Sequence, residues 1–163
     1  MPKLVACGGR GAAFDHFLTA HSGQIAGQYM AMLIDSEDRM TDTEAAWAHV
    51  KARDGWEKPR GVSDEQVLLM TTCMETWIVV DPAALARHYG HSLQISALPP
   101  LVNVESRTRD DVHARLESAT RGCSNAYAKG KRSFEVLGQI DPKALEPHLP
   151  SFVRMLRILR NKL

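Results

Sequence analysis

The chain has 163 residues, a length that fits one domain spanning residues 1–163. Its composition, 44% hydrophobic and 24% charged, is typical of a globular protein. The net charge of +1 excludes a global field that would recruit nucleic acid or membranes, so any such partner must meet a local patch. No apolar run approaches the roughly 18 residues of a membrane helix, and the N-terminus lacks signal-peptide architecture. We therefore expect a cytoplasmic protein without membrane contact.

The cysteines argue against a zinc centre. Cys7, Cys73 and Cys123 are odd in number and show no Cys-x-x-Cys spacing, and no His-Glu-x-x-His motif is present. This usage fits buried thiols in a reducing compartment better than a zinc site or a zinc enzyme.

The first predicted unit is a strand over residues 4–7, a glycine loop, and a helix over residues 12–20. A strand, a glycine loop and a helix can present backbone N–H groups to an anion. Gly9, Arg10 and Gly11 are therefore candidates for binding a phosphate. The loop is not Gly-x-Gly-x-x-Gly and lacks Gly-Lys-Ser/Thr, so a tight turn with a solvated Arg10 is an equal alternative.

A second strand is predicted over residues 28–34, and it ends abruptly in acidic residues. In open α/β sheets, ligands bind outside the carboxyl ends of the strands. Asp35 and Glu37 are two apart, so in extended backbone they point the same way and could hold a divalent cation. The alternative is that Asp35, Ser36 and Asp38 turn the chain and cap the next helix.

A third strand is predicted over residues 67–72, followed by an apolar run that ends at Asp81. Glu75 lies inside this run, where a carboxylate costs several kcal/mol unless it is paired or bound to a cation. A salt bridge to an arginine is the alternative. Asp81 is either a further metal ligand or, with Pro82 after it, the N-cap of a helix.

The remaining segments predict helices, over residues 44–52, 82–89, 109–121 and 150–163, with shorter ones near residues 133–137 and 141–142. In the last long helix, Arg154 and Arg157 lie off the apolar stripe, and we expect a solvated basic face, with contact to nucleic acid as the alternative. The order β-α-β-α-β-α, then helices, predicts an α/β fold: a small, mostly parallel three-stranded sheet with helices on both faces and a helical C-terminal half.

Several motifs resemble one known family nearly end to end. They are Asp35-Ser36-Glu37, Cys73-Met74-Glu75-Thr76-Trp77 with Asp81, Tyr127-Ala128-Lys129-Gly130, Ala6-Cys7-Gly8-Gly9-Arg10, Arg53-Asp54-Gly55-Trp56 and Lys131-Arg132-Ser133-Phe134. The chain resembles the domain of unknown function 4276 family. That family is similar to TOPRIM (topoisomerase–primase) domains of the overcoming-lysogenization-defect nuclease kind, so the resemblance implies a TOPRIM/Rossmann-like sheet.

The resemblance implies a metal-dependent phosphodiester hydrolase acting on nucleic acid with Mg²⁺ or Mn²⁺, in phage defence beside an ATPase encoded nearby. By similarity, Asp35 and Glu37 match the metal motif, and Glu75 and Asp81 match carboxylates after the next strand. Lys129 matches a late lysine near the scissile phosphate, so Lys129 and Glu75 are the implied catalytic residues. Such ions prefer oxygen ligands and can stabilise in-line displacement at phosphorus.

One departure from the family pattern matters. TOPRIM domains open with a strand ending in Glu-Gly, and here no acidic residue precedes Asp15. We therefore expect an N-terminally incomplete domain with an exposed inner sheet edge and an incomplete metal site, which would be active as a nuclease only with the N-terminal strand present. Two further hypotheses stay open: a non-catalytic module that binds a phosphate ligand through residues 8–11 and 129–132 or docks on a partner ATPase, and a truncated reading frame without activity.

Overall fold

The computed structural model describes residues 3–23 and 27–163, and it is built around two parallel strands. Strand β1 (Met32–Asp35) pairs with β2 (Val67–Met70), with Met32 opposite Val67 and Asp35 opposite Met70. The α/β class predicted from the sequence is confirmed. The strands are shorter than predicted, and both end at the acidic and polar residues that follow the apolar runs.

The predicted strand over residues 4–7 is wrong. Residues 3–7 form no regular structure, and Leu4 and Val5 are 92% and 59% exposed. A short apolar run becomes a strand only where it finds a pairing edge and a face to bury, and this segment has neither. Within the described residues the sheet therefore has two strands instead of three.

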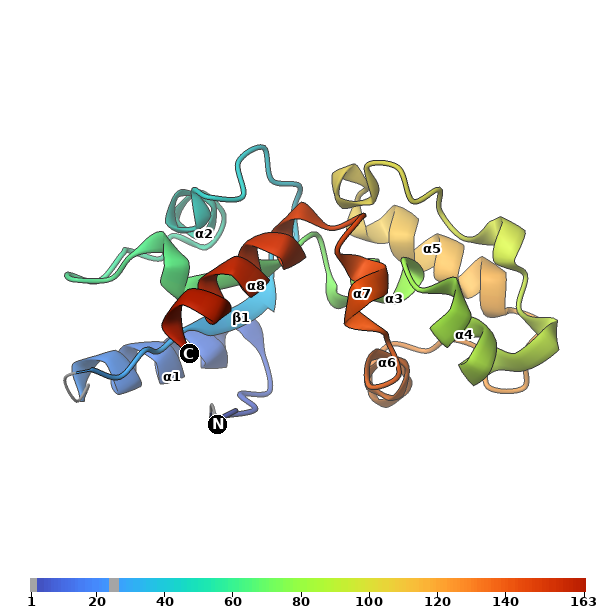
Figure 1. Cartoon of the computed structure of the whole chain (residues 1–163), viewed down its shortest axis with the longest axis horizontal. Coiled ribbons are helices and arrows are strands. Elements are labelled where there is room, and N and C mark those ends of the chain that lie inside the picture. The colour runs from blue at the N-terminus through green and yellow to red at the C-terminus, as the bar shows by residue number, and fades with distance from the viewer. Residues whose placement is uncertain (1–2, 24–26) are drawn as a thin grey trace.

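One face of the sheet is covered by the first two helices, α1 (Arg10–Ser22) and α2 (Ala46–Asp54) (Figure 1). Alternate strand residues bury their side chains here, as a period of two requires. The cluster comprises Met32, Ile34, Val67 and Leu69 from the strands, together with Phe17, Trp47, Val50, Ala46 and Val62. Helix α2 ends at Gly55, whose φ of 73° is left-handed.

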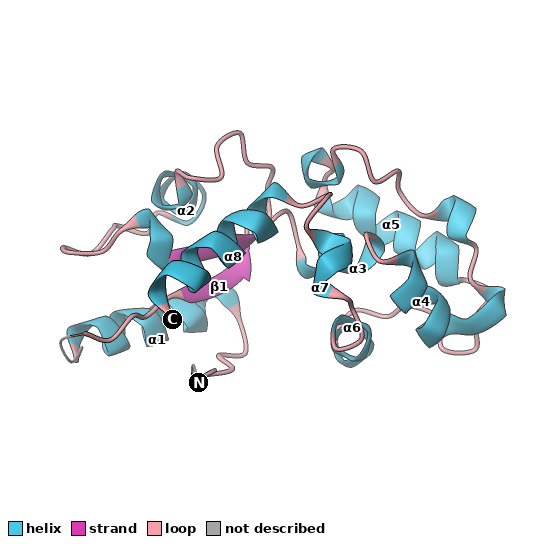
Figure 2. Ribbon diagram, viewed as in Figure 1, coloured by secondary structure: helices cyan, strands magenta, loops and turns pink. Residues whose placement is uncertain are grey.

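The C-terminal helix α8 (Pro150–Lys162) returns to cover the other face at β2 (Figure 2). Leu68 of β2 joins the same apolar cluster as Phe152 and Ile158 of α8. The prediction that the basic face of this helix is solvated is wrong for Arg154, whose side chain is buried and only 6% exposed. Arg154 donates to the backbone carbonyls of Val67 at 3.0 Å and Asp64 at 2.8 Å.

The other helices form a second, larger core beside the sheet (Figure 1). They are α3 (Met74–Val79), α4 (Pro82–Tyr89), α5 (Arg109–Thr120), α6 (Lys131–Leu137) and α7 (Pro142–Leu145). Short 3₁₀ turns occur at Asp64–Gln66, Gly90–Ser92, Ile95–Ala97 and Val104–Ser106. None of the described helices is both long and apolar enough to cross a membrane.

Candidate functional site

The carboxyl ends of the two strands are joined by backbone hydrogen bonds that continue past the strands. Ser36 N donates to Met70 O at 2.9 Å, and Glu37 N donates to Thr72 O at 2.7 Å. Glu37 has a φ of 66°, an unusual conformation for a residue with a side chain. These bonds fix the acidic segment after β1 against the segment that leads from β2 into α3.

Asp35 is half-buried at the end of β1. The backbone N–H of Met74 lies close enough to the Asp35 carboxylate to act against the rise in its pKa. Its Oδ1 is shielded from solvent and has no hydrogen-bond partner among the described residues. A buried carboxylate oxygen without a donor is costly, which makes this atom a candidate for binding a cation or a hydrogen-bond donor.

Glu75 lies in the first turn of α3 and is 3% exposed. Tyr127 Oη donates to its Oε1 at 2.7 Å, and Ser133 Oγ donates to the same oxygen at 3.4 Å. His113 Nε2 of α5 lies 3.2 Å from Oε2. The charge partner of this carboxylate is therefore a histidine, where the sequence suggested an arginine.

The three predicted carboxylates influence one another. Burial, the negative charge of Glu75 and then that of Glu37 raise the pKa of Asp35 to about 6, while Met74 and the positive charge of Lys129 act in the opposite direction. Asp35, Glu37 and Glu75 thus lie close enough at the carboxyl ends of the strands for their charges to interact, and exposed Lys129 also acts on Asp35. Within the described part of the chain, however, their oxygens do not form one group within 4.8 Å.

Glu75 and His113 form a charge pair. Burial acts to raise the pKa of Glu75, but the interactions with His113 and Tyr127 outweigh it and lower the pKa to about 2. The contacts with Cys73 and then Glu75 raise the pKa of His113 to about 9, against the effect of burial. Both groups are therefore ionised at neutral pH.

The Glu37 carboxylate is paired with an arginine side chain. Arg109, the first residue of α5, donates to the Glu37 carboxylate through Nη1. Both side chains line an open hollow of about 530 Å³. Arginines and acids share its walls: Arg39, Arg53, Arg109, Glu37, Asp38 and Asp110, with Thr108.

Arg10, the arginine of the glycine loop at the start of α1, is engaged by residues of the protein itself. Gly9 is the N-cap of α1 in extended conformation. Arg10 donates to both carboxylate oxygens of Asp54, at 3.1 and 2.5 Å, and to the backbone carbonyl of Asp35. Its guanidinium also lies 5.1 Å from the centre of the Trp56 ring. Gly11 lies inside α1, so of these three residues only Arg10 contacts the acidic segment with its side chain.

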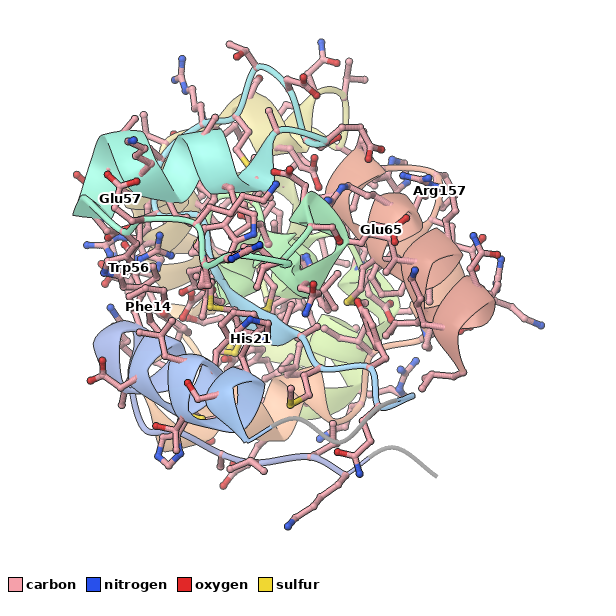
Figure 3. All side chains as sticks on the ribbon, turned by 90° about the vertical axis from the view of Figure 1, so that its left-hand side faces the viewer. Phe14, His21, Trp56, Glu57, Glu65 and Arg157 are labelled. Carbon is pink, nitrogen blue, oxygen red and sulfur yellow. The ribbon has the colours of Figure 1, made fainter. Side chains whose placement is uncertain are left out.

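The Trp56 ring stacks on α1. Figure 3 shows Trp56 beside Phe14, and the two ring centroids are 4.2 Å apart at an interplanar angle of 4°. This contact closes the loop after α2 over α1, as expected for a tryptophan that packs on its own domain.

Asp81 acts as a helix cap. Its Oδ1 accepts from Ala84 N at 2.9 Å, and its Oδ2 accepts from Asp141 N at 2.9 Å. Both oxygens are used by the backbone of the helical half, so we leave Asp81 out of the candidate site.

The sequence did not indicate His113, Arg109 and Cys73 as residues of the site. His113 occupies one flank of an amphipathic helix, and no local pattern in the sequence indicates that it faces Glu75.

Comparison with known proteins places the chain in a family. The sequence model of the domain of unknown function DUF4276 matches residues 12–160. The chain belongs to the DUF4276 family. No curated protein and no solved structure matches it. As its description states, DUF4276 carries no assigned activity, and the likeness of this DUF4276 chain to TOPRIM domains stays an expectation from its sequence motifs.

Proposed function

We propose that the chain is a divalent-metal-dependent phosphodiester hydrolase whose site is formed by Asp35, Glu37 and Glu75. The observation that supports this function best is the buried oxygen of Asp35, partner-free among the described residues, at the carboxyl ends of two parallel strands, where the charges of Glu75, Glu37 and Lys129 also act on it. Ligand sites of open α/β sheets lie at this edge. A nucleic-acid substrate and an ATPase partner remain part of the proposal, through the family resemblance alone.

The oxygen of Asp35 that is partner-free in the described part of the chain suits Mg²⁺ or Mn²⁺, whereas Glu37 and Glu75 would have to turn from Arg109 and His113 to bind the same ion. Asp35 Oδ1 is buried without a partner among the described residues, and the pKa of Asp35 is raised to about 6 by burial and by the negative charges of Glu75 and Glu37. A bound cation would relieve this repulsion, and hard ions of this kind prefer carboxylate oxygens. When bound, the ion would supply Lewis-acid stabilisation of phosphoryl charge and a more acidic water.

The cationic side chains around the carboxylates suit a phosphodiester. Arg39, Arg53 and Arg109 line the hollow beside Glu37, and guanidinium groups match the geometry of phosphate oxygens. In the proposed mechanism, Arg109 holds a phosphate in the hollow, and Lys129 offsets the negative charge that develops at the scissile group. Tyr127 keeps Glu75 ionised and oriented through its 2.7 Å hydrogen bond.

The test uses the purified chain with plasmid DNA and with single-stranded DNA in the presence of Mn²⁺. We expect metal-dependent cleavage that falls by about 100-fold or more in Asp35→Asn and in Glu37→Gln. The matched control is Asp15→Asn, which removes an exposed carboxylate on α1 and leaves cleavage unchanged. Absence of cleavage, or cleavage that persists in both site variants, contradicts the proposal.

A phosphate-binding module without catalysis is the second candidate. The specific observation in its favour is that Glu37 is paired with Arg109 and Glu75 is paired with His113, so protein cations already neutralise two of the carboxylates. This candidate requires that a single-stranded oligonucleotide binds without being cleaved. Binding should weaken about tenfold in Arg109→Gln and stay unchanged in Asp35→Asn.

A further inference from the structure

A second group of potential metal ligands shares Glu75 with the three carboxylates and differs from them in chemistry. Cys73 Sγ, a Glu75 carboxylate oxygen and a His113 ring nitrogen all lie within 4.8 Å of one another. Cys73 is 1% exposed and Glu75 is 3% exposed. The cysteine and the glutamate come from the start of α3, and the histidine comes from α5, which packs against α3.

The spacing of the two nearest atoms is that of neighbouring ligands. His113 Nε2 lies 3.2 Å from Glu75 Oε2, yet Nε2 makes no aligned hydrogen bond within the described part of the chain. In a tetrahedral zinc site, bonds of about 2.0–2.1 Å place a nitrogen and an oxygen ligand about 3.3 Å apart. The observed separation therefore requires little movement for both atoms to bind one ion, and the ion would displace the proton that His113 holds in its pair with Glu75, because only the neutral imidazole binds a metal.

Neighbouring groups hold these ligands in place. Tyr127 Oη donates to Glu75 Oε1 at 2.7 Å, which leaves Oε2 directed at His113. Thr76 Oγ1 lies 3.7 Å from Cys73 Sγ. Hydrogen bonds that orient a ligand from behind are a regular part of metal sites and strengthen metal binding.

We propose that Cys73, Glu75 and His113 form a three-ligand site for a borderline transition-metal ion of the Zn²⁺ class, with a fourth position open to water. Thiolate and imidazole ligands select such ions over Mg²⁺, and three protein ligands with an open position are typical of catalytic zinc sites. The site goes beyond the proposed hydrolase function and does not depend on it. It shares Glu75 with the carboxylate site but uses neither Asp35 nor Glu37.

Cobalt(II) tests this assignment on the whole, unmodified chain. After treatment with a chelator, the protein is titrated with Co²⁺ and its visible and near-ultraviolet absorption is recorded. We expect one equivalent of Co²⁺ to give tetrahedral ligand-field bands together with a thiolate-to-cobalt charge-transfer band, and Zn²⁺ to displace it. A wild-type spectrum without the charge-transfer band overturns the proposal, whatever the variants show.

Variants then assign the ligands. Cys73→Ser should abolish the charge-transfer band, and His113→Gln should weaken Zn²⁺ binding at least tenfold, as measured by competition with a chromogenic chelator. The control Cys123→Ser, at a buried cysteine outside the group, should keep the band. A band that survives Cys73→Ser, or Zn²⁺ affinity unchanged in His113→Gln, also overturns the proposal.

One double variant distinguishes failure of the transition-metal site from failure of the proposed hydrolase function. The double variant Asp35→Asn with Glu37→Gln should lose Mn²⁺-dependent cleavage but keep the cobalt charge-transfer band. Loss of the band in this double variant, with the fold retained by circular dichroism, would contradict a site that is independent of these two residues.

Discussion

At the scale of single residues, Arg10 is the side chain that connects the acidic segment to the helices around it. It donates to Asp54 and to the backbone of Asp35, and it lies over the Trp56 ring. The pair with Asp54 is largely shielded, with side-chain exposures of 16% and 11%. A pair this shielded contributes more to stability than an exposed ion pair, because water screens it less.

We expect Asp54→Asn to lower the free energy of unfolding by about 2 kcal/mol at pH 7, because Arg10 loses its charged partner. Partial burial acts to raise the pKa of Asp54, but Arg10 and Arg53 outweigh it and hold the pKa below its ordinary value. This carboxylate therefore stabilises the fold above its unfolded pKa of about 3.9, and the contribution disappears as the pH falls through the lower, folded pKa.

Urea unfolding of wild type and Asp54→Asn at a series of pH values measures this effect. The difference between the two should be constant from pH 7 to about pH 4 and shrink below that. The control Lys51→Ala breaks an exposed ion pair with Glu57 and should change stability by less than about 0.5 kcal/mol. A difference that grows on acidification would contradict the assigned role of Asp54.

At the scale of elements, α8 is attached to the sheet through a buried arginine. Arg154 donates to the carbonyls of Val67 and Asp64, and to Glu44 at 3.2 Å. Arg157 is three residues further along the same helix, half-exposed, and also pairs with Glu44. The two arginines thus share one acid but differ in burial.

We expect Arg154→Met to destabilise the protein by about 3 kcal/mol, because two carbonyls lose their donor where water does not replace it. Arg157→Met should cost less than about 1 kcal/mol, since its ion pair is exposed. Denaturant unfolding of the two variants gives the comparison. Equal effects would show that the backbone contacts of Arg154 do not hold the helix to the sheet.

Helix α8 shows which features of the elements the sequence could predict and which it could not. The stripe of Phe152, Leu156 and Leu159 predicts the helix, and Asp81-Pro82 predicts the start of α4, because these signals are local. Arg154 is buried because it bonds carbonyls that lie 87 and 90 residues away in the sequence. The periodicity within the helix cannot predict contacts at such a distance. The strand predicted over residues 4–7 failed for the same reason, since a strand requires a distant partner.

At the scale of the whole molecule, two apolar clusters are joined through one strand. Leu69 belongs to the cluster with α1 and α2, whereas its neighbour Leu68 belongs to the cluster with α8 and the helical half. The tryptophans divide in the same way: Trp47 and Trp56 lie with the first cluster, and Trp77 lies in the second. Because β2 contributes to both clusters, they should unfold together.

We expect single-tryptophan variants that retain Trp47 or Trp77 to report the same urea midpoint. Leu69→Ala and Leu116→Ala, one in each cluster, should each lower the free energy of unfolding by about 2–5 kcal/mol and shift both reporters equally. Two separate midpoints, or a shift seen by one reporter alone, would show that the clusters are independent units.

Part of the candidate site could be predicted from the sequence. An acid at the end of a strand, such as Asp35, or inside an apolar run, such as Glu75, is visible as a local pattern, so the sequence can single out Asp35, Glu37 and Glu75 as candidates. Their partners could not be, because His113 and Tyr127 are brought to Glu75 by the packing of helices that follow much later in the chain. Conversely, Asp81 and Arg10 carry the right chemistry, but the fold uses them for a helix cap and an internal ion pair.

The return of α8 to β2 has a consequence for the newly made chain. Arg154 reaches Val67 across 87 residues, and Tyr127 reaches Glu75 across 52. At ribosomal rates of about 5–20 residues per second, β2 waits on the order of ten seconds for its last covering helix. During synthesis Leu68 therefore lacks its α8 partners, and chaperones that bind nascent apolar segments should bind there until the C-terminal helix emerges.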